Sequence, residues 1–68
     1  MINIMDRIKE IKEEAKDNKE TEFIFATFKY CFFEGECDGT ARRALNILIK
    51  DGVLVRKLVN KKYRYIVD

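Results

Sequence analysis

Arg42, Arg43 and Asn46 stand at the spacing of one helix side, because residues three and four positions apart are neighbours on a helix. An arginine guanidinium offers a bidentate fork to guanine O6 and N7, and an asparagine amide pairs with adenine N6 and N7. Thr40 precedes this group, and Lys50 follows it where contact with a phosphate is expected. The pattern therefore indicates hydrogen bonding to the base edges and backbone of a nucleic acid.

Five more cations follow near the end of the chain, around the polar dipeptide Asn60-Lys61. The runs on either side of that dipeptide are rich in β-branched and aromatic residues, so they predict a hairpin over residues 53–67. A basic hairpin can hold phosphates, which positions a protein without reading base sequence. Lysines on a strand edge also prevent aggregation, and this second interpretation stays open. The cations are Arg56, Lys57, Lys61, Lys62 and Arg64.

Charge is distributed unevenly along the chain. Residues 1–41 carry six Lys/Arg against ten Asp/Glu, a net charge of −4, and residues 42–68 carry eight against two, a net charge of +6. The formal net charge of the whole is +2. A half this basic suits a polyanionic partner, but two halves of opposite charge also attract each other on an ordinary solvated surface.

The length of 68 residues leaves room for a single domain, over residues 1–68, with little area for a core. A domain this small needs efficient apolar packing, a second copy of itself, or both. We expect a homodimer, with Met1, Ile2 and Met5 at its surface. The apolar share of 47% argues against a disordered chain.

The first helix is expected over about residues 4–16. Apolar residues recur from Ile4 to Ala15 at steps of four, three and four, which is one stripe along a helix. The side chain of Asn3 is placed to accept hydrogen bonds from the first free backbone N–H groups.

Residues 21–34 have two interpretations. Phe23 and Phe25 alternate as in a short strand, whereas Phe28 and Phe32 recur at helical spacing. The favoured interpretation is a strand over residues 22–25 and a helix over about 27–34 that is capped by Thr27. One continuous helix from Thr21 is the alternative. In both cases the aromatic side chains supply much of the core.

A turn and a third helix precede the hairpin. Two glycines indicate the turn over residues 35–39, and Asp38 is a favourable N-cap for a helix over about 39–50. Gly52 stands where a left-handed residue commonly ends a helix. These elements predict an α+β fold with three helices, a short strand between the first two, and a C-terminal hairpin.

This order of elements resembles the winged helix-turn-helix superfamily. Residues 40–57 are similar to the recognition helix and first wing strand of bacterial and archaeal repressors of the GntR and MarR type. In those families a small residue, basic residues, paired apolar residues and an acidic-Gly-apolar step follow in the same order. The matching stretch is Thr40-Ala41-Arg42-Arg43-Ala44-Leu45-Asn46-Ile47-Leu48-Ile49-Lys50-Asp51-Gly52-Val53-Leu54-Val55-Arg56-Lys57.

The resemblance implies a transcriptional regulator that binds double-stranded DNA. The helix over about 39–50 would enter the major groove, and the hairpin would lie as a wing on the flanking backbone or in the minor groove. A homodimer would bind a pseudo-palindromic site with half-sites about 34 Å apart. Small regulators of archaeal viruses, plasmids and phages are similar in size.

A protein-interaction module is the alternative function, because winged helices also serve as adaptors. Glu34, Glu36 and Asp38 make the turn before the third helix acidic, and carboxylates repel phosphates. A viral or phage inhibitor of a host factor belongs to the same class.

Catalysis, cofactors and small-molecule ligands are not expected, because the chain has neither His nor Ser and no phosphate-binding loop. Cys31 is expected in the core and Cys37 in the turn. The two cysteines are too few for a four-ligand zinc site, and a redox-sensitive pair is their alternative role. No apolar run approaches the roughly 20 residues of a membrane span. The first residues lack the features of a signal peptide, so a cytoplasmic location is expected.

Overall fold

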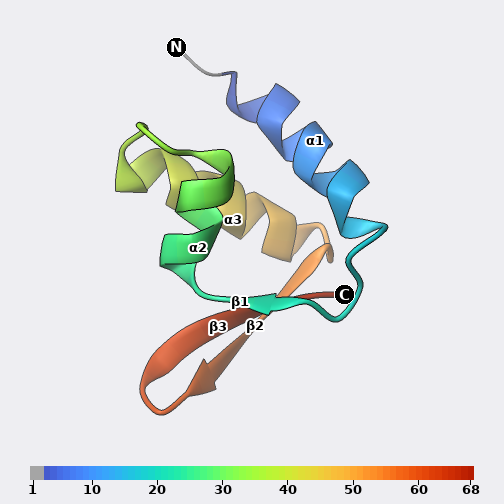
Figure 1. Ribbon diagram of the computed structural model, residues 1–68, viewed down its shortest axis with the longest axis vertical. Helices are drawn as coiled ribbons and strands as arrows, with labels where there is room; N and C mark the ends of the chain where they lie inside the picture. The colour runs from blue at the N-terminus through green and yellow to red at the C-terminus, as the bar shows by residue number, and fades with distance from the viewer. Residues whose placement is uncertain (1–2) are drawn as a thin grey trace.

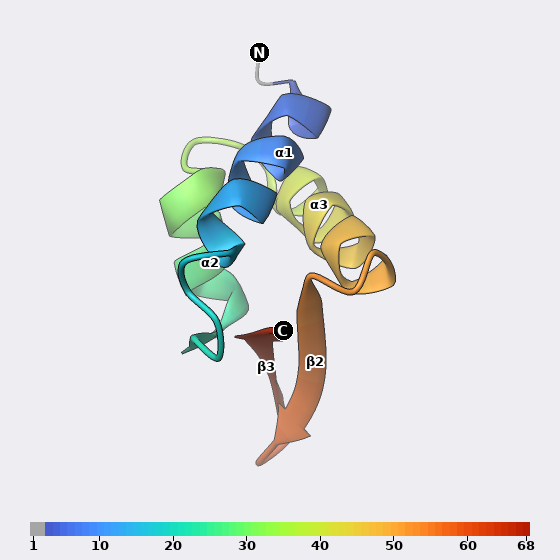
Figure 2. The same cartoon turned by 90° about the vertical axis from the view of Figure 1, so that its right-hand side faces the viewer.

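The computed structural model describes residues 3–68 and shows three helices and one three-stranded antiparallel sheet (Figure 1). The sheet lies at one end of the helices, and its last two strands project as a hairpin (Figure 2). This confirms the predicted α+β class and is consistent with a winged helix. Met1 and Ile2, expected at a dimer surface, lie outside the described residues. The elements are α1 (Ile4–Ala15), β1 (Glu22–Phe23), α2 (Phe25–Phe32), α3 (Asp38–Lys50), β2 (Leu54–Val59) and β3 (Lys62–Val67).

The first helix, α1, forms where its apolar stripe predicts it. Asn3 caps the helix, because its side chain accepts hydrogen bonds from the backbone N–H groups of Met5 and Asp6. Ile8, Ile11 and Ala15 are buried against the rest of the domain.

The second helix, α2, begins at Phe25, two residues before the predicted start. Its N-cap is Ile24, which makes no side-chain capping bond, so the prediction that Thr27 caps this helix is wrong. Phe28 is buried, and Phe32, four residues later on the same side of the helix, packs against the core. Burial of these rings outweighs the loss of a polar cap, which is worth about 1 kcal/mol. The short strand before α2 is confirmed, although it spans only Glu22–Phe23.

The three strands follow the order β1-β3-β2, so β3 pairs with both neighbours. Residues opposite each other on paired strands lie on the same face of the sheet. The inner face, toward the helices, therefore carries the pairs Leu54–Val67, Arg56–Tyr65 and Leu58–Tyr63. The outer face carries the pairs Val55–Ile66, Lys57–Arg64 and Val59–Lys62. Tyr65 is 4% exposed, which ties the inner face to the core.

The hairpin turns at Asn60 and Lys61, as predicted. Both residues have positive φ, 51° and 67°. Two consecutive residues in this conformation make the type I′ turn, whose twist matches that of the two strands. The hairpin therefore has a narrow, two-residue tip.

An aromatic cluster forms the centre of the core. The Phe28 ring lies 5.8 Å from the Phe23 ring, 5.6 Å from the Phe32 ring and 5.7 Å from the Phe33 ring, measured between centroids. Phe28 and Phe33 are 2% and 1% exposed. The cluster joins α2 to the sheet through Phe23, whose ring also stacks with that of Tyr65.

Within the part of the chain that the structure describes, no helix has the length and apolar character needed to cross a membrane.

Replacement of Phe28 by Ala is expected to lower the free energy of unfolding by about 3–5 kcal/mol, because it removes a buried ring and leaves a cavity. Tyr30→Ala on the same helix is the control, because Tyr30 is 69% exposed and its loss should change stability by no more than about 0.5 kcal/mol. Urea unfolding of both variants measures the difference. Equal losses would contradict the assignment of the core.

Candidate nucleic-acid interface

The side of α3 that faces away from the core carries Arg43, Asn46 and Lys50, and all three are exposed. Steps of three and four residues place them in one stripe. The opposite side of the helix is buried and consists of Ala41, Ala44, Leu45 and Leu48. The predicted division of this helix into an apolar and a polar face is therefore present.

Arg42 occupies the flank of α3 next to α2. Its guanidinium carbon lies 4.3 Å from the centroid of the Phe25 ring, which is a cation–π contact. Stacking of this kind leaves the N–H groups in the guanidinium plane free to donate. The sequence does not predict this role of Phe25, because it depends on the position of Phe25 at the start of α2, next to α3.

The N-terminal end of α3 is organised differently from the prediction. The N-cap is Cys37, and Asp38 is the first helical residue, so the predicted capping role of Asp38 is wrong. The Asp38 carboxylate instead accepts a hydrogen bond from Lys29 Nζ at 2.7 Å. This bond and the charge of Lys29 lower the pKa of Asp38, and the charge of Arg42 adds to the effect.

Thr40 is half-buried, and its hydroxyl lies 3.2 Å from the thiol of Cys37. The hydrogen bond between them lowers the pKa of Cys37. The hydroxyl that was expected to reach a nucleic acid is therefore already engaged within the chain.

On the outer face of the hairpin, Lys57 and Arg64 both pair with Glu22 of β1. The Lys57 Nζ lies 3.7 Å from a carboxylate oxygen of Glu22, and Arg64 Nε donates to the other oxygen. Glu22 was not singled out from the sequence, because only the pairing of β1 with β3 brings it to these cations. Two of the five predicted hairpin cations are thus partly neutralised.

The other hairpin cations remain open to solvent. Arg56 lies on the inner face with its guanidinium carbon 4.9 Å from the centroid of the Tyr63 ring. Lys61 is in the turn, and Lys62 is on the outer face. None of the three forms an ion pair with any described residue.

Carboxylates near α3 are held by lysines of other elements. Lys29 forms an ion pair with Asp38 at the start of α3. Lys12 of α1 forms an ion pair with Asp51 just after the end of α3, with 2.9 Å between Lys12 Nζ and the carboxylate oxygen. Glu34 and Glu36, in the turn before α3, have no ion-pair partner among residues 3–68. An anionic ligand would therefore meet α3 along its exposed stripe and not at this turn.

The hairpin folds back beneath the helix that precedes it. It leaves the C-terminal end of α3 and runs below the helices, so that its tip lies on the side of the molecule where α3 begins (Figure 1). In this view the tip of the hairpin and the first turn of α3 thus lie on the same side, with the hairpin below the helices (Figure 1).

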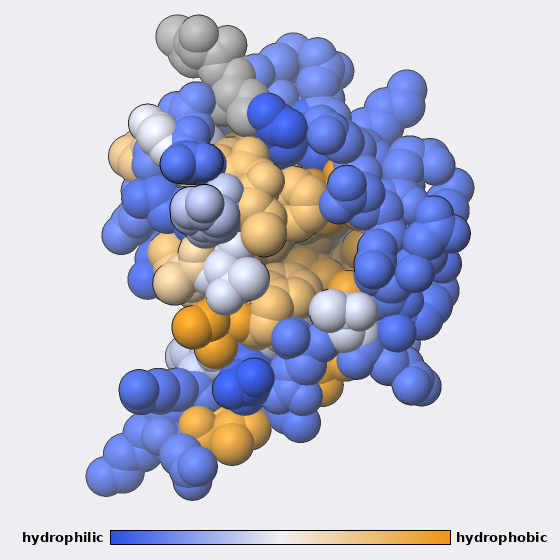
Figure 3. All heavy atoms as spheres, in the orientation of Figure 1, coloured by the Kyte–Doolittle hydropathy of each residue, from blue (hydrophilic) through white to orange (hydrophobic). Residues whose placement is uncertain are grey.

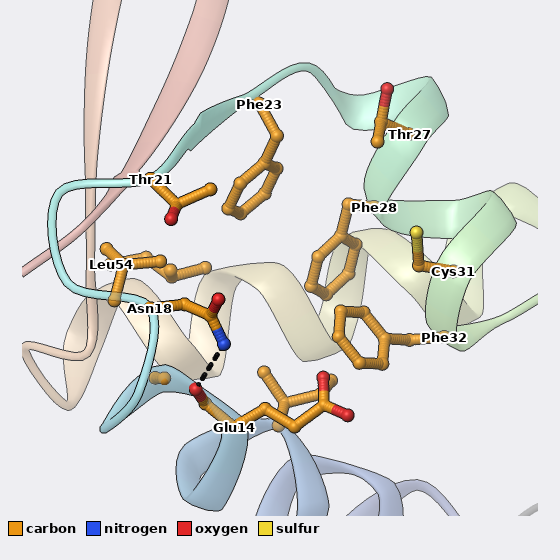
Figure 4. A pocket seen from close by; sticks show the side chains of 12 residues that line it. Glu14, Asn18, Thr21, Phe23, Thr27, Phe28, Cys31, Phe32 and Leu54 are labelled. Carbon is orange, nitrogen blue, oxygen red and sulfur yellow. Dashed lines mark hydrogen bonds between the residues drawn. The ribbon is translucent and has the colours of Figure 1, made fainter.

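An apolar hollow lies elsewhere on the domain. Apolar side chains gather in the middle of the face seen in Figure 3, with hydrophilic side chains on either side. A cavity of about 260 Å³ opens there between the end of α1, β1 and α2. Figure 4 shows Phe23, Phe28 and Phe32 along one side of it, opposite Asn18, whose amide donates to the Glu14 carbonyl.

Cys31 lines this cavity from α2 and is exposed, so its predicted place in the core is wrong. Phe28, three residues earlier, takes the buried position of the helix. Glu14 and Cys31 are the two titratable residues in the lining, and neither a histidine nor a lysine accompanies the thiol. Among the described residues no group of His, Cys, Asp and Glu side chains is arranged to hold a metal ion.

Comparison of the chain with protein-family models, with curated proteins and with solved structures finds no match.

Replacement of Lys29 by Met is expected to raise the pKa of Asp38 toward that of an ordinary carboxyl. A carboxyl whose pKa is lowered by folding stabilises the fold above its unfolded pKa and loses that contribution as pH falls through its folded pKa. The wild type should therefore have a higher Tm than Lys29→Met at neutral pH, and the difference should disappear in strong acid.

Thermal unfolding across this pH range, with a titration of the Asp38 carboxyl by NMR, measures both effects. Lys9→Met removes an exposed lysine of α1 that has no ion-pair partner among the described residues, and it serves as the control. A Tm difference that persisted unchanged into acid would contradict the assignment.

Proposed function

We propose that this chain is a DNA-binding regulator of transcription that places α3 in the major groove of a duplex and its hairpin beside it. The observation that carries the proposal is that one molecule presents both an exposed polar stripe on α3 and a cationic hairpin. In Figure 1 the tip of the hairpin lies on the side of the molecule where α3 begins. We propose that α3 supplies the contacts with base edges and that the hairpin supplies contacts with the DNA backbone.

The α3 stripe has the composition that base recognition requires. The major groove is about 12 Å wide and admits one helix. Arg43 and Asn46 offer the two side-chain types that pair with purine edges, and no carboxylate stands between them. The carboxylates at the two ends of the helix, Asp38 and Asp51, are neutralised by lysines of α2 and α1.

The cations that suit contacts with the DNA backbone are those that are exposed and have no ion-pair partner within the described residues. Lys50, Arg56, Lys61 and Lys62 have no ion-pair partner among residues 3–68 and are exposed, so they suit phosphates. Lys57, Arg64 and Thr40 already have partners within the chain and take a secondary part. Arg42 reaches a base edge while its ring contact with Phe25 keeps it oriented.

A second copy of the chain extends this arrangement to a two-fold site. Dimeric helix-turn-helix proteins bind half-sites about 34 Å apart, one on each side of the symmetry axis. Met5, on α1, is 59% exposed and belongs to the dimer surface that we propose. The regulator would act in the cytoplasm, where it meets the DNA.

An adaptor that binds another protein is the second candidate, and the turn before α3 favours it. Tyr30 is 69% exposed and lines a shallow hollow together with Phe25, Glu34 and Gly35. Lys29 and Asp38 also line the hollow but pair with each other, so among the described residues Glu34 is the one unpaired charge beside the exposed tyrosine, which suits a protein partner better than a phosphate backbone. Reversal of charge at Arg43 should leave binding at this hollow intact, whereas Arg42 contacts Phe25 in its lining.

Arg43→Ala is expected to weaken binding to a preferred duplex by roughly 5- to 150-fold, the equivalent of about 1–3 kcal/mol for one bidentate contact with a base. Lys9→Ala is the matched control, because Lys9 is an exposed cation of α1 that has no ion-pair partner among the described residues. A duplex selected from a random library with the wild type provides the ligand, and fluorescence anisotropy gives Kd. Equal affinities of the two variants would contradict base recognition by Arg43.

Replacement of both Lys61 and Lys62 by Ala is expected to change the salt dependence of binding. Each phosphate contact contributes about 0.9 to the slope of log K against log salt concentration. The slope should therefore become less steep by about 1.8 if both lysines contact phosphates. Anisotropy titrations at several salt concentrations measure it, and absence of duplex binding by the wild type at low salt would refute the proposed function.

A further inference from the structure

Leu58 and Tyr63 form an exposed apolar pair on the inner face of the hairpin. They are directly opposite each other on β2 and β3, and they are 62% and 52% exposed. Other members of this face are in the core: Leu54, Tyr65 and Val67 are 2%, 4% and 6% exposed. The difference arises because the hairpin extends past the helices, so its distal half has no helix above it (Figure 1).

The surroundings of this pair are cationic. Three hairpin cations, Arg56, Lys61 and Lys62, have no ion-pair partner among residues 3–68, and the hairpin itself contains no Asp or Glu. Arg56 stacks on the Tyr63 ring from the same face, and Lys61 follows in the turn. A ligand that complements this surface must present an apolar site flanked by negatively charged groups.

Duplex DNA offers such a site at a base step seen from the minor groove. The stacked bases are apolar, and phosphates line both sides of the groove. Proteins that bind there commonly insert apolar side chains between bases, while neighbouring cations hold the backbone. An anionic lipid surface offers related chemistry, but it gives no role to the stripe of Arg43 and Asn46 on α3.

The hairpin also holds the two side chains in a defined arrangement, which insertion requires. The type I′ turn at Asn60 and Lys61 and the continuous register from Leu54 to Val67 hold the two apolar side chains next to each other. The cation–π contact with Arg56 orients the Tyr63 ring before any ligand arrives.

We infer that Leu58 and Tyr63 form a wedge that enters the minor groove beside the α3 site, opens one base step and bends the duplex. The inference rests on the proposed function. Pyrimidine–purine steps such as TA unstack most easily, so the preferred site should contain one of them beneath the hairpin. The specificity of the protein then comes partly from DNA deformability and not only from contacts with base edges.

The test compares two double variants of the same hairpin. Leu58→Ala with Tyr63→Ala removes the wedge, whereas Val55→Ala with Val59→Ala removes two apolar side chains from the outer face, where they are 48% and 36% exposed. The duplex is about 30 base pairs long, is selected with the wild type, and carries a fluorophore at each end. Energy transfer reports the bend, anisotropy reports affinity, and circular dichroism verifies the fold.

The wild type is expected to bend the duplex. The wedge variant should bind roughly 5- to 150-fold more weakly, the range for losing an aromatic that stacks on a base, and should bend the duplex less. The outer-face variant should stay within about twofold of the wild type. Leu58→Ala alone, which keeps the contact between Arg56 and Tyr63, should also reduce the bend.

Three outcomes would overturn the wedge. If the wedge variant binds and bends the selected duplex as the wild type does, the wedge is wrong while DNA binding stands. If the wild type binds no duplex, the proposed function itself fails and the wedge fails with it. If the wedge variant keeps its DNA affinity but loses binding to vesicles of phosphatidylglycerol that the wild type binds, the pair belongs to a lipid surface.

Discussion

The antiparallel register of β3 against β1 and β2 is the constraint on which the arrangement of this domain depends. Side chains alternate between the two faces of a strand, so a shift of one residue would exchange the faces. Burial of Tyr65 against the aromatic cluster around Phe28 prevents that shift. The same register turns Arg56, Leu58 and Tyr63 toward the side of the helices and leaves Lys57 and Arg64 on the opposite face.

The fold also decides which charges are available to a ligand. Sequence position alone makes the cations of residues 42–68 equivalent, but the tertiary structure pairs some of them and leaves others open. Glu22 neutralises two hairpin cations from a strand about 40 residues away. Conversely, two lysines neutralise carboxylates at the ends of α3: Lys29 pairs with Asp38, and Lys12 pairs with Asp51. As a result, no unpaired carboxylate of α3 lies next to its exposed stripe.

In the candidate interface, two arginines are oriented by stacking on aromatic rings, which the composition of the chain does not reveal. Arg42 lies over Phe25, and Arg56 lies over Tyr63. In each pair the ring restricts a flexible cation while the guanidinium edge stays able to donate. Preorganisation of this kind reduces the entropy that a long side chain loses when it binds. Each contact also explains why an aromatic ring is left partly exposed.

The local pattern of residues determined most of the secondary structure of this protein. The apolar stripe of α1 with its Asn3 cap, the two-faced α3 and the turn at Asn60-Lys61 all follow from short-range preferences that act within a few residues. Tertiary structure alone decided where α2 starts, that Cys31 faces solvent, that Asp38 binds Lys29, and which hairpin cations Glu22 engages. The physical reason is that burial and ion pairing join residues far apart in the chain, and a partner that distant leaves no trace in the local spacing of side chains.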